Sequence, residues 1–268
     1  YANSNCTQHV SIASKRENIG DGYFGWGIGY DNNDNKLRFS VRQDYINEKV
    51  ETSLIYDEWT HLVCVFDSNN ELLIYINGQL SSSSPTNFIG LHDNNAPFLI
   101  GAHVNWSPFD ILSWNFKGSL DEMFIYDRVL TSSEISNVYS CNSIIPSQNL
   151  QGYWDFNEGS GNIVLDQSGN THNGLISSGS YDLNSPSISN NQSISYLDVI
   201  ACESYEWNGQ TYAESGTYEY SEQNDNEYSM SFDGNDDIEI PNNSTLQLGH
   251  FTIGGWVYLN DNTQKCFI

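Results

Sequence analysis

Four oxygen-bearing side chains gather in one turn near the C-terminus of this 268-residue chain. They are Asp233, Asn235, Asp236 and Asp237, and Gly234 lies among them. Carboxylate and amide oxygens are the ligands that calcium prefers, so Asp233, Asn235 and Asp236 are candidate calcium ligands. The alternative is that these residues only build a solvated turn, because Asp and Asn favour turns for conformational reasons.

A second group of residues has the types that bind sugars. It consists of Trp106 and Trp114, whose rings could stack on a pyranose, with His103, Asn105 and Asp110 as polar neighbours. All five lie in one segment between two expected strands, and loops on a sandwich scaffold commonly carry recognition. The alternative is that both tryptophans pack over the open end of the sheet.

The acidic residues do not follow the pattern of a retaining glycosidase, which needs two carboxylates about 5–5.5 Å apart. Asp121 and Glu122 are adjacent, so on a regular strand they would point to opposite faces. Glu222, Asp225 and Glu227 have the wrong spacing and lie in a polar stretch. No G-x-S-x-G nucleophile motif occurs, although a triad of distant residues stays open. We therefore expect a protein that is not an enzyme.

The charge balance excludes two classes of partner. The chain has 34 Asp and Glu against 9 Lys and Arg, for a formal net charge of −25, yet charged residues make up only 16 % of it. The acidity therefore reflects scarce basic residues. Nucleic acid and anionic membrane surfaces both attract clustered cations, so neither is expected as a partner. No apolar run approaches the roughly 20 residues of a membrane span.

The cysteines and the ends of the sequence set the expected context. There is no C-x-x-C pair, so zinc and redox motifs are not indicated. Cys64 lies in an apolar run and is expected to be a buried thiol. The pairing of the others stays open; they are Cys6, Cys141, Cys202 and Cys266. Because the chain begins at Tyr1, we expect a piece of a longer protein whose signal peptide lies outside it.

Short alternating runs bounded by Asn, Asp, Gly and Ser predict strands throughout the chain. The expected strands are residues 24–30, 36–42, 59–66, 71–76, 98–102 and 120–126. The one expected helix or turn is residues 131–135, which begins like a capping box with Thr131 and Glu134 three apart. This pattern predicts an all-β protein, an antiparallel β-sandwich or jelly roll.

Polar stretches predict the connections. The serine run at residues 81–85 is expected to be an exposed loop, and residues 177–195, rich in Ser, Asn and Pro, a linker. Residues 201–218 are rich in Tyr and acidic residues and flank Asn208-Gly209, a turn that is typical of a small β-hairpin.

Within each of three sets of motifs, the residue pattern matches that of one known family. The first is W-T-H-L-V at 59–63 with L-I-Y-I-N-G at 73–78, and the second is G-S-L-D-E-M-F-I-Y-D-R-V-L at 118–130 with S-E-I at 133–135. The third is S-F-D-G-N-D-D-I-E-I-P at 231–241 with F-T-I-G-G-W-V at 251–257. Together they resemble the laminin G-like (LamG) jelly rolls of the concanavalin A-like lectin/glucanase superfamily. His61 occupies a family strand position and is expected to be structural.

The order of these motifs differs from that of the family, because the opening motif stands at the C-terminus. The expected parts are a C-terminal jelly-roll part at 1–142, a LamG-type strand pair at 149–176, the linker at 177–195, the hairpin repeat at 196–222 and an N-terminal jelly-roll part at 226–268. Two accounts fit this order: one period of a tandem array, or a circularly permuted jelly roll within one chain. The second account requires the C-terminal part to pair with residues 59–128.

The resemblance implies a function and a setting. It implies a non-catalytic extracellular module for recognition or adhesion, with a polysaccharide, a glycoconjugate or a cell-surface protein as partner. LamG-like modules often hold calcium near the sheet rim, which would add Asp121 to the candidate ligands. The hairpin resembles repeats of large secreted adhesin-like proteins of marine, Bacteroidetes-like bacteria. The alternatives are a structural spacer without a ligand and a glucanase-like enzyme.

Overall fold

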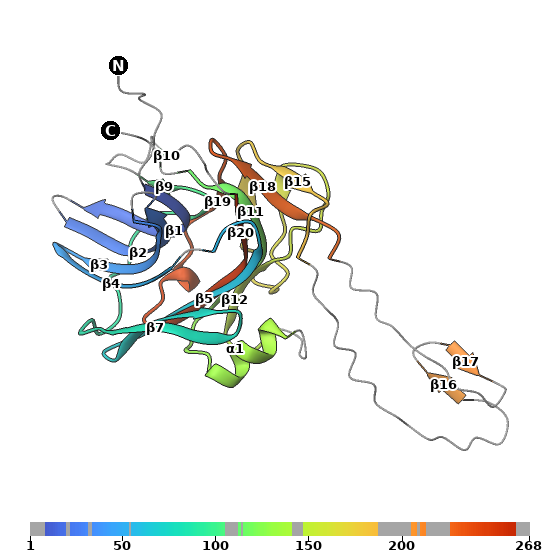
Figure 1. The fold of residues 1–268 in the computed structure, drawn as a ribbon, viewed down its shortest axis with the longest axis horizontal. Coiled ribbons are helices and arrows are strands. Elements are labelled where there is room, and N and C mark those ends of the chain that lie inside the picture. The colour runs from blue at the N-terminus through green and yellow to red at the C-terminus, as the bar shows by residue number, and fades with distance from the viewer. Residues whose placement is uncertain are drawn as a thin grey trace.

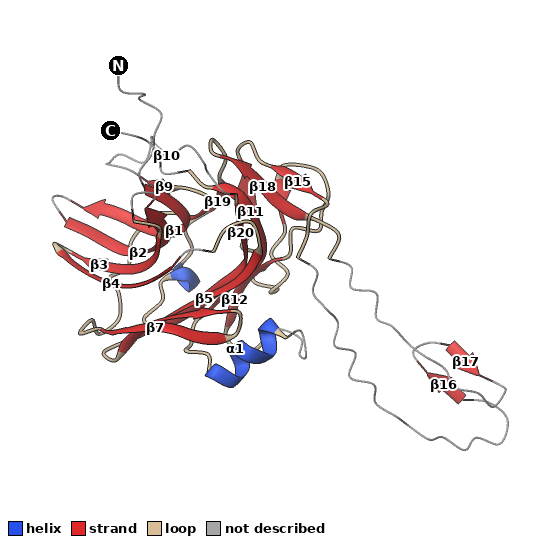
Figure 2. Ribbon diagram, in the orientation of Figure 1, coloured by secondary structure: helices blue, strands red, loops and turns tan. Residues whose placement is uncertain are grey.

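The computed structural model describes ten parts of the chain (Figures 1 and 2). These are residues 9–19, 22–31, 34–53, 55–104, 112–113, 115–140, 147–186, 205–207, 210–212 and 226–260. They form two eight-stranded antiparallel sheets and two small two-stranded sheets. The predicted all-β sandwich is therefore confirmed.

The first large sheet, sheet A, contains most of the N-terminal strands. Its order is β13 (Ile163–Val164), β14 (Gly174–Ile176), β19 (Ile238–Ile240), β8 (Phe98–Ile100), β1 (His9–Ile19), β2 (Gly22–Asp31), β3 (Lys36–Gln43) and β4 (Ile46–Ser53). Strands β1 to β4 form a curved layer of successive hairpins (Figure 1).

The second large sheet, sheet B, packs against sheet A. Its order is β15 (Ser180–Asp182), β18 (Ser229–Asp233), β11 (Lys117–Tyr126), β20 (Phe251–Leu259), β5 (Trp59–Asp67), β6 (Glu71–Ile76) and β7 (Gln79–Pro85), and β12 (Leu150–Trp154) also pairs with β11. The small sheets join β9 (His103–Val104) with β10 (Leu112–Ser113) and β16 (Tyr205–Trp207) with β17 (Gln210–Tyr212).

The main core lies between the sheets and is built from aromatic rings that alternate along the strands. Trp26 of β2 lies 5.2 Å from Phe251 of β20, measured between ring centroids, and Phe66 lies 5.8 Å from the same ring. Phe98 and Trp154 form another such pair at 5.4 Å. Burial of each large side chain contributes about 1.5–3 kcal/mol, and tilted ring pairs add to that.

A smaller core covers the outer face of sheet B. Helix α1 (Ser132–Tyr139) buries Ile135 against Val65, Phe124 and Tyr126. The predicted capping box is present, since the Thr131 hydroxyl accepts from the Glu134 N–H while Glu134 accepts from the Thr131 N–H. Among the described residues, no helix combines the length and the apolar character needed to cross a membrane.

The C-terminal strands complete both sheets. β20 lies between β5 and β11, with Ile253 opposite Cys64 on one side and Ile125 on the other. β18 pairs with β11, and β19 pairs with β8 of sheet A. The pairing that a permuted jelly roll requires is therefore present within this chain. Cys64 is free and fully buried, as predicted, whereas the other four cysteines lie outside the described residues.

Three connecting segments differ from, or add to, the expectations. The serine run at 81–85 is not a loop but part of β7, an exposed edge strand that pairs with β6. Ser180–Asp182, inside the expected linker at 177–195, form β15 and pair with β18, so they belong to a sheet. Residues 187–195 of that segment lie outside the described residues. The predicted hairpin is confirmed by the pairing of Tyr205 with Tyr212.

Candidate functional site

The turn between β18 and β19 is held by its own hydrogen bonds. Asp233 Oδ1 accepts from the backbone N–H of Asn235 at 3.0 Å and from its side-chain amide at 3.4 Å. Asp236 Oδ2 accepts from the Asp233 N–H at 2.5 Å, and its Oδ1 accepts from the Ser178 hydroxyl at 2.8 Å. Asp236 thus uses both oxygens within the protein. Calcium binding at this turn stays a prediction.

Asp121 is not close to this turn. Asp233 lies opposite Lys117 on β11, and Asp121 lies four residues farther along that strand, or about 13 Å. The Asp121 carboxyl is fully buried, accepts from the Asn226 amide at 3.0 Å and accepts from the Glu122 N–H at 2.8 Å. Burial and then the neighbouring Glu122 charge raise the pKa of Asp121 to about 9.

A β-bulge brings Glu122 to the same face of the sheet as Asp121. The pairing of β11 with β20 shifts between Asp121 and Phe124, and Glu122 has a φ of 52°, which non-glycine residues rarely adopt. The Glu122 carboxylate accepts a hydrogen bond from the Tyr153 hydroxyl. The expectation that the two acidic side chains point to opposite faces is therefore wrong, because it assumed a regular strand.

We call Asp121, Glu122, Asp155 and Asn226 the acid pocket. Burial raises the pKa of Glu122 to about 7. The hydrogen bond from Tyr153 acts against this shift, and the charge of Asp155 adds to it. Asn226 Oδ1 is buried and has no hydrogen-bond partner in the described structure. In the described part of the chain, no three His, Cys, Asp or Glu side chains converge as a metal-binding group. Two carboxylates with an orphaned amide oxygen nevertheless form a donor set that suits a hard cation.

The acid pocket does not fit glycoside hydrolysis. A catalytic carboxyl must reach the glycosidic bond, and the carboxyl of Asp121 is fully covered by protein. The raised pKa values therefore reflect burial beside like charges inside the fold.

Four of the five predicted sugar-binding residues lie outside the described residues: Asn105, Trp106, Asp110 and Trp114. The fifth, His103, begins β9 and is only 8 % exposed. Burial, and then the charges of Arg16 and Arg42, lower its pKa to about 3. The segment expected to bind sugar therefore starts beside two arginines that sequence reasoning did not single out.

On the outer face of β2, which is turned away from the main core, three successive positions are glycines and carry no side chain. Gly25, Gly27 and Gly29 alternate with the core residues Trp26 and Ile28. Because side chains alternate across a strand, the three glycines share the outer face. We call these glycines, with Arg16, Ser40 and Arg42 beside them, the glycine face.

The flanking strands supply polar side chains to the glycine face. Arg16 of β1 and Arg42 of β3 both lie opposite Gly25, and Ser40 of β3 lies opposite Gly27. The Arg16 guanidinium reaches across β2, donates to the Ser40 hydroxyl and lies where a Gly27 side chain would be. Two adjacent rows, Arg16–Gly25–Arg42–Asn47 and Ser14–Gly27–Ser40–Lys49, contain no carboxylate.

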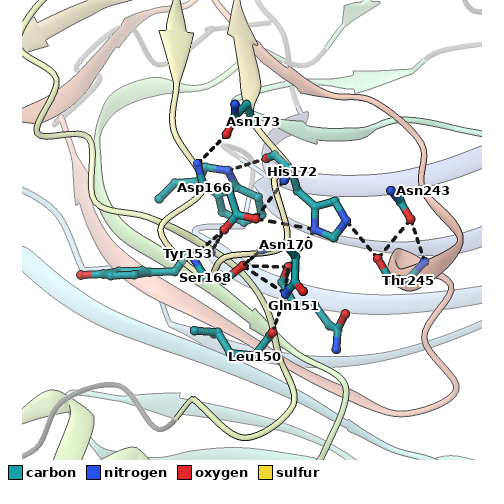
Figure 3. A network of polar contacts seen from close by, with 11 residues as sticks. Leu150, Gln151, Tyr153, Asp166, Ser168, Asn170, His172, Asn173, Asn243 and Thr245 are labelled. Carbon is teal, nitrogen blue, oxygen red and sulfur yellow. Dashed lines mark hydrogen bonds and ion pairs between the residues drawn. The ribbon is translucent and has the colours of Figure 1, made fainter.

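A buried polar network joins residues 166–173, the connection between β13 and β14, to the rest of the sandwich (Figure 3). The carboxylate of Asp166 is fully buried and accepts from the backbone N–H groups of Tyr153, Ser168 and His172 at 2.9–3.0 Å. One carboxylate thus satisfies two backbone donors of an irregular loop and one of strand β12, which is a structural role.

His172 extends this network to the 3₁₀ helix η1 (Ser244–Leu246). Its Nδ1 contacts the Gln151 carbonyl at 2.8 Å, and its Nε2 contacts the Thr245 hydroxyl at 2.9 Å (Figure 3). A carbonyl can only accept, so Nδ1 carries the proton. The Thr245–His172–Asp166 line is not a catalytic triad, because the Gln151 carbonyl takes the position of the orienting carboxylate and Asp166 lies 3.8 Å away.

Comparisons with known proteins agree with the fold. Residues 2–136 match the family described as the concanavalin A-like lectin/glucanases superfamily. Human adhesion G-protein coupled receptor D1 is 31 % identical over 84 residues, which are 31 % of this chain and 9 % of the receptor. The chain therefore matches less than a tenth of that relative's length. No solved structure matches it.

The family match covers half of the chain, and its residues supply β1 to β11, the strands on which the two-sheet sandwich is built. The motifs at 59–78 and 118–130 fall within it and form β5, β6 and β11. By sequence and by architecture, the chain belongs to the concanavalin A-like lectin/glucanases superfamily.

Proposed function

We propose that this chain is a non-catalytic extracellular recognition module that binds carbohydrate on the glycine face. The observation that carries the proposal is the row Gly25, Gly27 and Gly29, which brings no side chain of β2 to this face between the polar residues of β1 and β3. A polar face with an aromatic residue at one end suits a sugar chain. Tyr23 continues the same side of β2, with the Arg42 guanidinium carbon 5.4 Å from its ring centre.

Two further observations support this proposal. The superfamily description includes lectins, and the matching human receptor is named for adhesion. The rows through Gly25 and Gly27 also lack the paired carboxylates that retaining hydrolysis would need. We place the chain in a large secreted bacterial adhesin built of repeats, to which the hairpin at 205–212 would belong.

A glycan array with matched variants tests the proposal. An added Cβ at Gly27 would meet only the flexible end of Arg16, at 3.0 Å, so Gly27→Val fills the glycine face with the least damage to the fold. Gly249→Val is the control, because its Cβ would have no atom within 4 Å. We expect wild type and Gly249→Val to bind the same glycans and Gly27→Val to lose them. No binding by wild type to any glycan would favour the structural spacer.

We also propose that the acid pocket holds a structural calcium ion through Asp121, Glu122 and Asn226. The supporting observation is the buried, unpartnered Oδ1 of Asn226 beside the Asp121 carboxyl, whose pKa is raised by burial and then by the neighbouring Glu122 charge. A bound divalent cation would neutralise those like charges and stabilise the sandwich.

Calorimetric titration with calcium tests whether the ion binds at the acid pocket or at the β18–β19 turn. Asp121→Asn should abolish the heat of binding and the rise of Tm with millimolar calcium. Asp233→Asn, the matched change in the turn, should leave both in place. The opposite pattern would assign calcium to the turn, and no response in wild type would remove calcium from the protein.

A further inference from the structure

Basic residues are concentrated in one region of this acidic chain. Six of the nine Lys and Arg lie between positions 15 and 49. Lys36, Arg38 and Lys49 all form ion pairs with Glu51, at 3.5, 2.7 and 2.7 Å. Outside this region, Arg128 pairs with Glu134 at 2.7 Å. Four of the eight Lys and Arg that the structure describes are therefore paired with an acid.

Arg16 and Arg42 depart from that state. Neither has an acidic partner within the part of the chain that the structure describes, and the Nε atom of each is buried without a hydrogen-bond partner. Among the described residues, Arg16 donates to the Ser40 hydroxyl and carbonyl oxygens, Arg42 contacts the face of Tyr23, and the charges of both act on His103. Orphaned, buried charge-bearing donors are costly, so a fold keeps them only with a compensating partner.

The two arginines are arranged to share one partner. Both lie opposite Gly25, two strands apart, which places their Cα atoms about 10 Å from each other. Burial, followed by repulsion from Arg42, lowers the pKa of Arg16 to about 9. The Arg16 guanidinium lies over Gly27 and that of Arg42 over the Tyr23 ring, so the two lie on either side of Gly25, which has no side chain.

We propose that Arg16 and Arg42 bind the anionic group, a sulfate or a carboxylate, of an acidic polysaccharide lying on the glycine face. The proposal rests on the carbohydrate-binding function above and adds the class of ligand to it. Guanidinium groups bind such oxyanions through paired N–H donors, which would satisfy the orphaned Nε atoms.

The charge of the whole protein sharpens this assignment. At a net charge of −25, the chain repels polyanions over most of its surface. Affinity for an acidic polysaccharide must therefore come from the local pair of arginines. Removing that pair should cost more than removing a cation elsewhere, and Lys117, an exposed residue of sheet B, provides the comparison.

The experiment measures binding of dextran sulfate and of unmodified dextran by wild type, by the double variant Arg16→Gln/Arg42→Gln and by Lys117→Gln. We expect wild type to prefer dextran sulfate, the double variant to lose about tenfold or more in affinity, and Lys117→Gln to stay within about twofold. The double variant Arg16→Lys/Arg42→Lys keeps the charge but loses the paired donors, so it should bind with intermediate affinity. This variant also keeps the test valid if the glutamine variant folds poorly.

Two further probes distinguish the source of the charge. Comparing the binding of polygalacturonate with that of its methyl ester tests whether a carboxylate is recognised. Binding of inorganic sulfate tests whether the anion site works without a sugar. Polysaccharide binding that is unchanged in the glutamine variant would overturn the arginine assignment and leave the carbohydrate function standing. Arginine-dependent sulfate binding with no polysaccharide binding would overturn the carbohydrate function, and the acidic-polysaccharide assignment with it.

Discussion

Arg16 lies across Gly27, with its guanidinium carbon 3.0 Å from the point where a Cβ on that glycine would stand. The contact joins β1 to β3 over the backbone of β2, because the same guanidinium reaches Ser40. The absence of a side chain at Gly27 is thus what allows a cation onto this face of the sheet.

The glycines of this row should differ sharply in their tolerance of substitution. Gly25 has a φ of 118°, and an added Cβ would lie 2.0 Å from the Lys15 carbonyl oxygen, so Gly25→Ala should lower the free energy of unfolding by about 2 kcal/mol or more. Gly27→Ala meets only a movable side chain and should cost less than about 1 kcal/mol. Urea denaturation of both variants checks this, and equal losses would contradict it.

His61 should make the protein sensitive to acid. It is 1 % exposed and packs against the rings of Trp256 and Tyr139, and burial lowers its pKa from 6.5 to about 3. Between those two values the unfolded chain binds a proton that the folded chain does not. The contribution of His61 to stability is therefore complete above about pH 6.5 and should fall toward pH 3, by up to about 1.4 kcal/mol per pH unit.

The measurement is the free energy of unfolding between pH 7 and pH 4 for wild type and for His61→Gln. The variant should show a shallower loss with acid, whatever its stability at pH 7. The exposed His250→Gln is the matched control and should keep the wild-type slope. Equal slopes for all three proteins would assign the acid sensitivity to other groups.

Asp166 should be among the polar residues on which the fold depends most. Asp166→Ala leaves three backbone N–H groups without their acceptor, and each orphaned buried donor costs about 1–3 kcal/mol. We expect a loss of at least about 3 kcal/mol in the free energy of unfolding. Asp182→Ala, an exposed residue that accepts one local bond, is the control and should cost less than about 1 kcal/mol. Comparable losses would show that the network of Figure 3 contributes little.

The capping box offers a smaller and local prediction. Thr131→Ala removes both the hydroxyl acceptor of the Glu134 N–H and a donor to the Glu134 carboxylate, so helix α1 should lose about 1 kcal/mol. Thr131→Ser restores the hydroxyl and should recover most of that stability. Thermal denaturation of the pair measures the difference, and a serine variant as unstable as the alanine variant would point to lost packing of the methyl group.

Local signals in the sequence predicted the helix and strands that form through interactions between residues close in sequence. The Thr131–Glu134 spacing predicted helix α1, and the alternation around Trp26 and Phe66 predicted the strands that carry the core. The prediction failed at residues 81–85, because a run of serines has little preference of its own and becomes a strand through its pairing with β6. Edge strands of this kind are decided by their neighbour.

The candidate sites depended on contacts that no local pattern records. The bulge at Glu122 reversed the expected direction of one acidic side chain, and Asp121 lies far along β11 from the turn to which the sequence had joined it. Arg16 and Arg42 are unremarkable in sequence, and only the register of β1, β2 and β3 brings them opposite one glycine. Strand composition and turn chemistry were thus determined by the sequence alone. Which charged side chains lie side by side on neighbouring strands was decided by the tertiary structure, because strand register is set by the packing of the whole core.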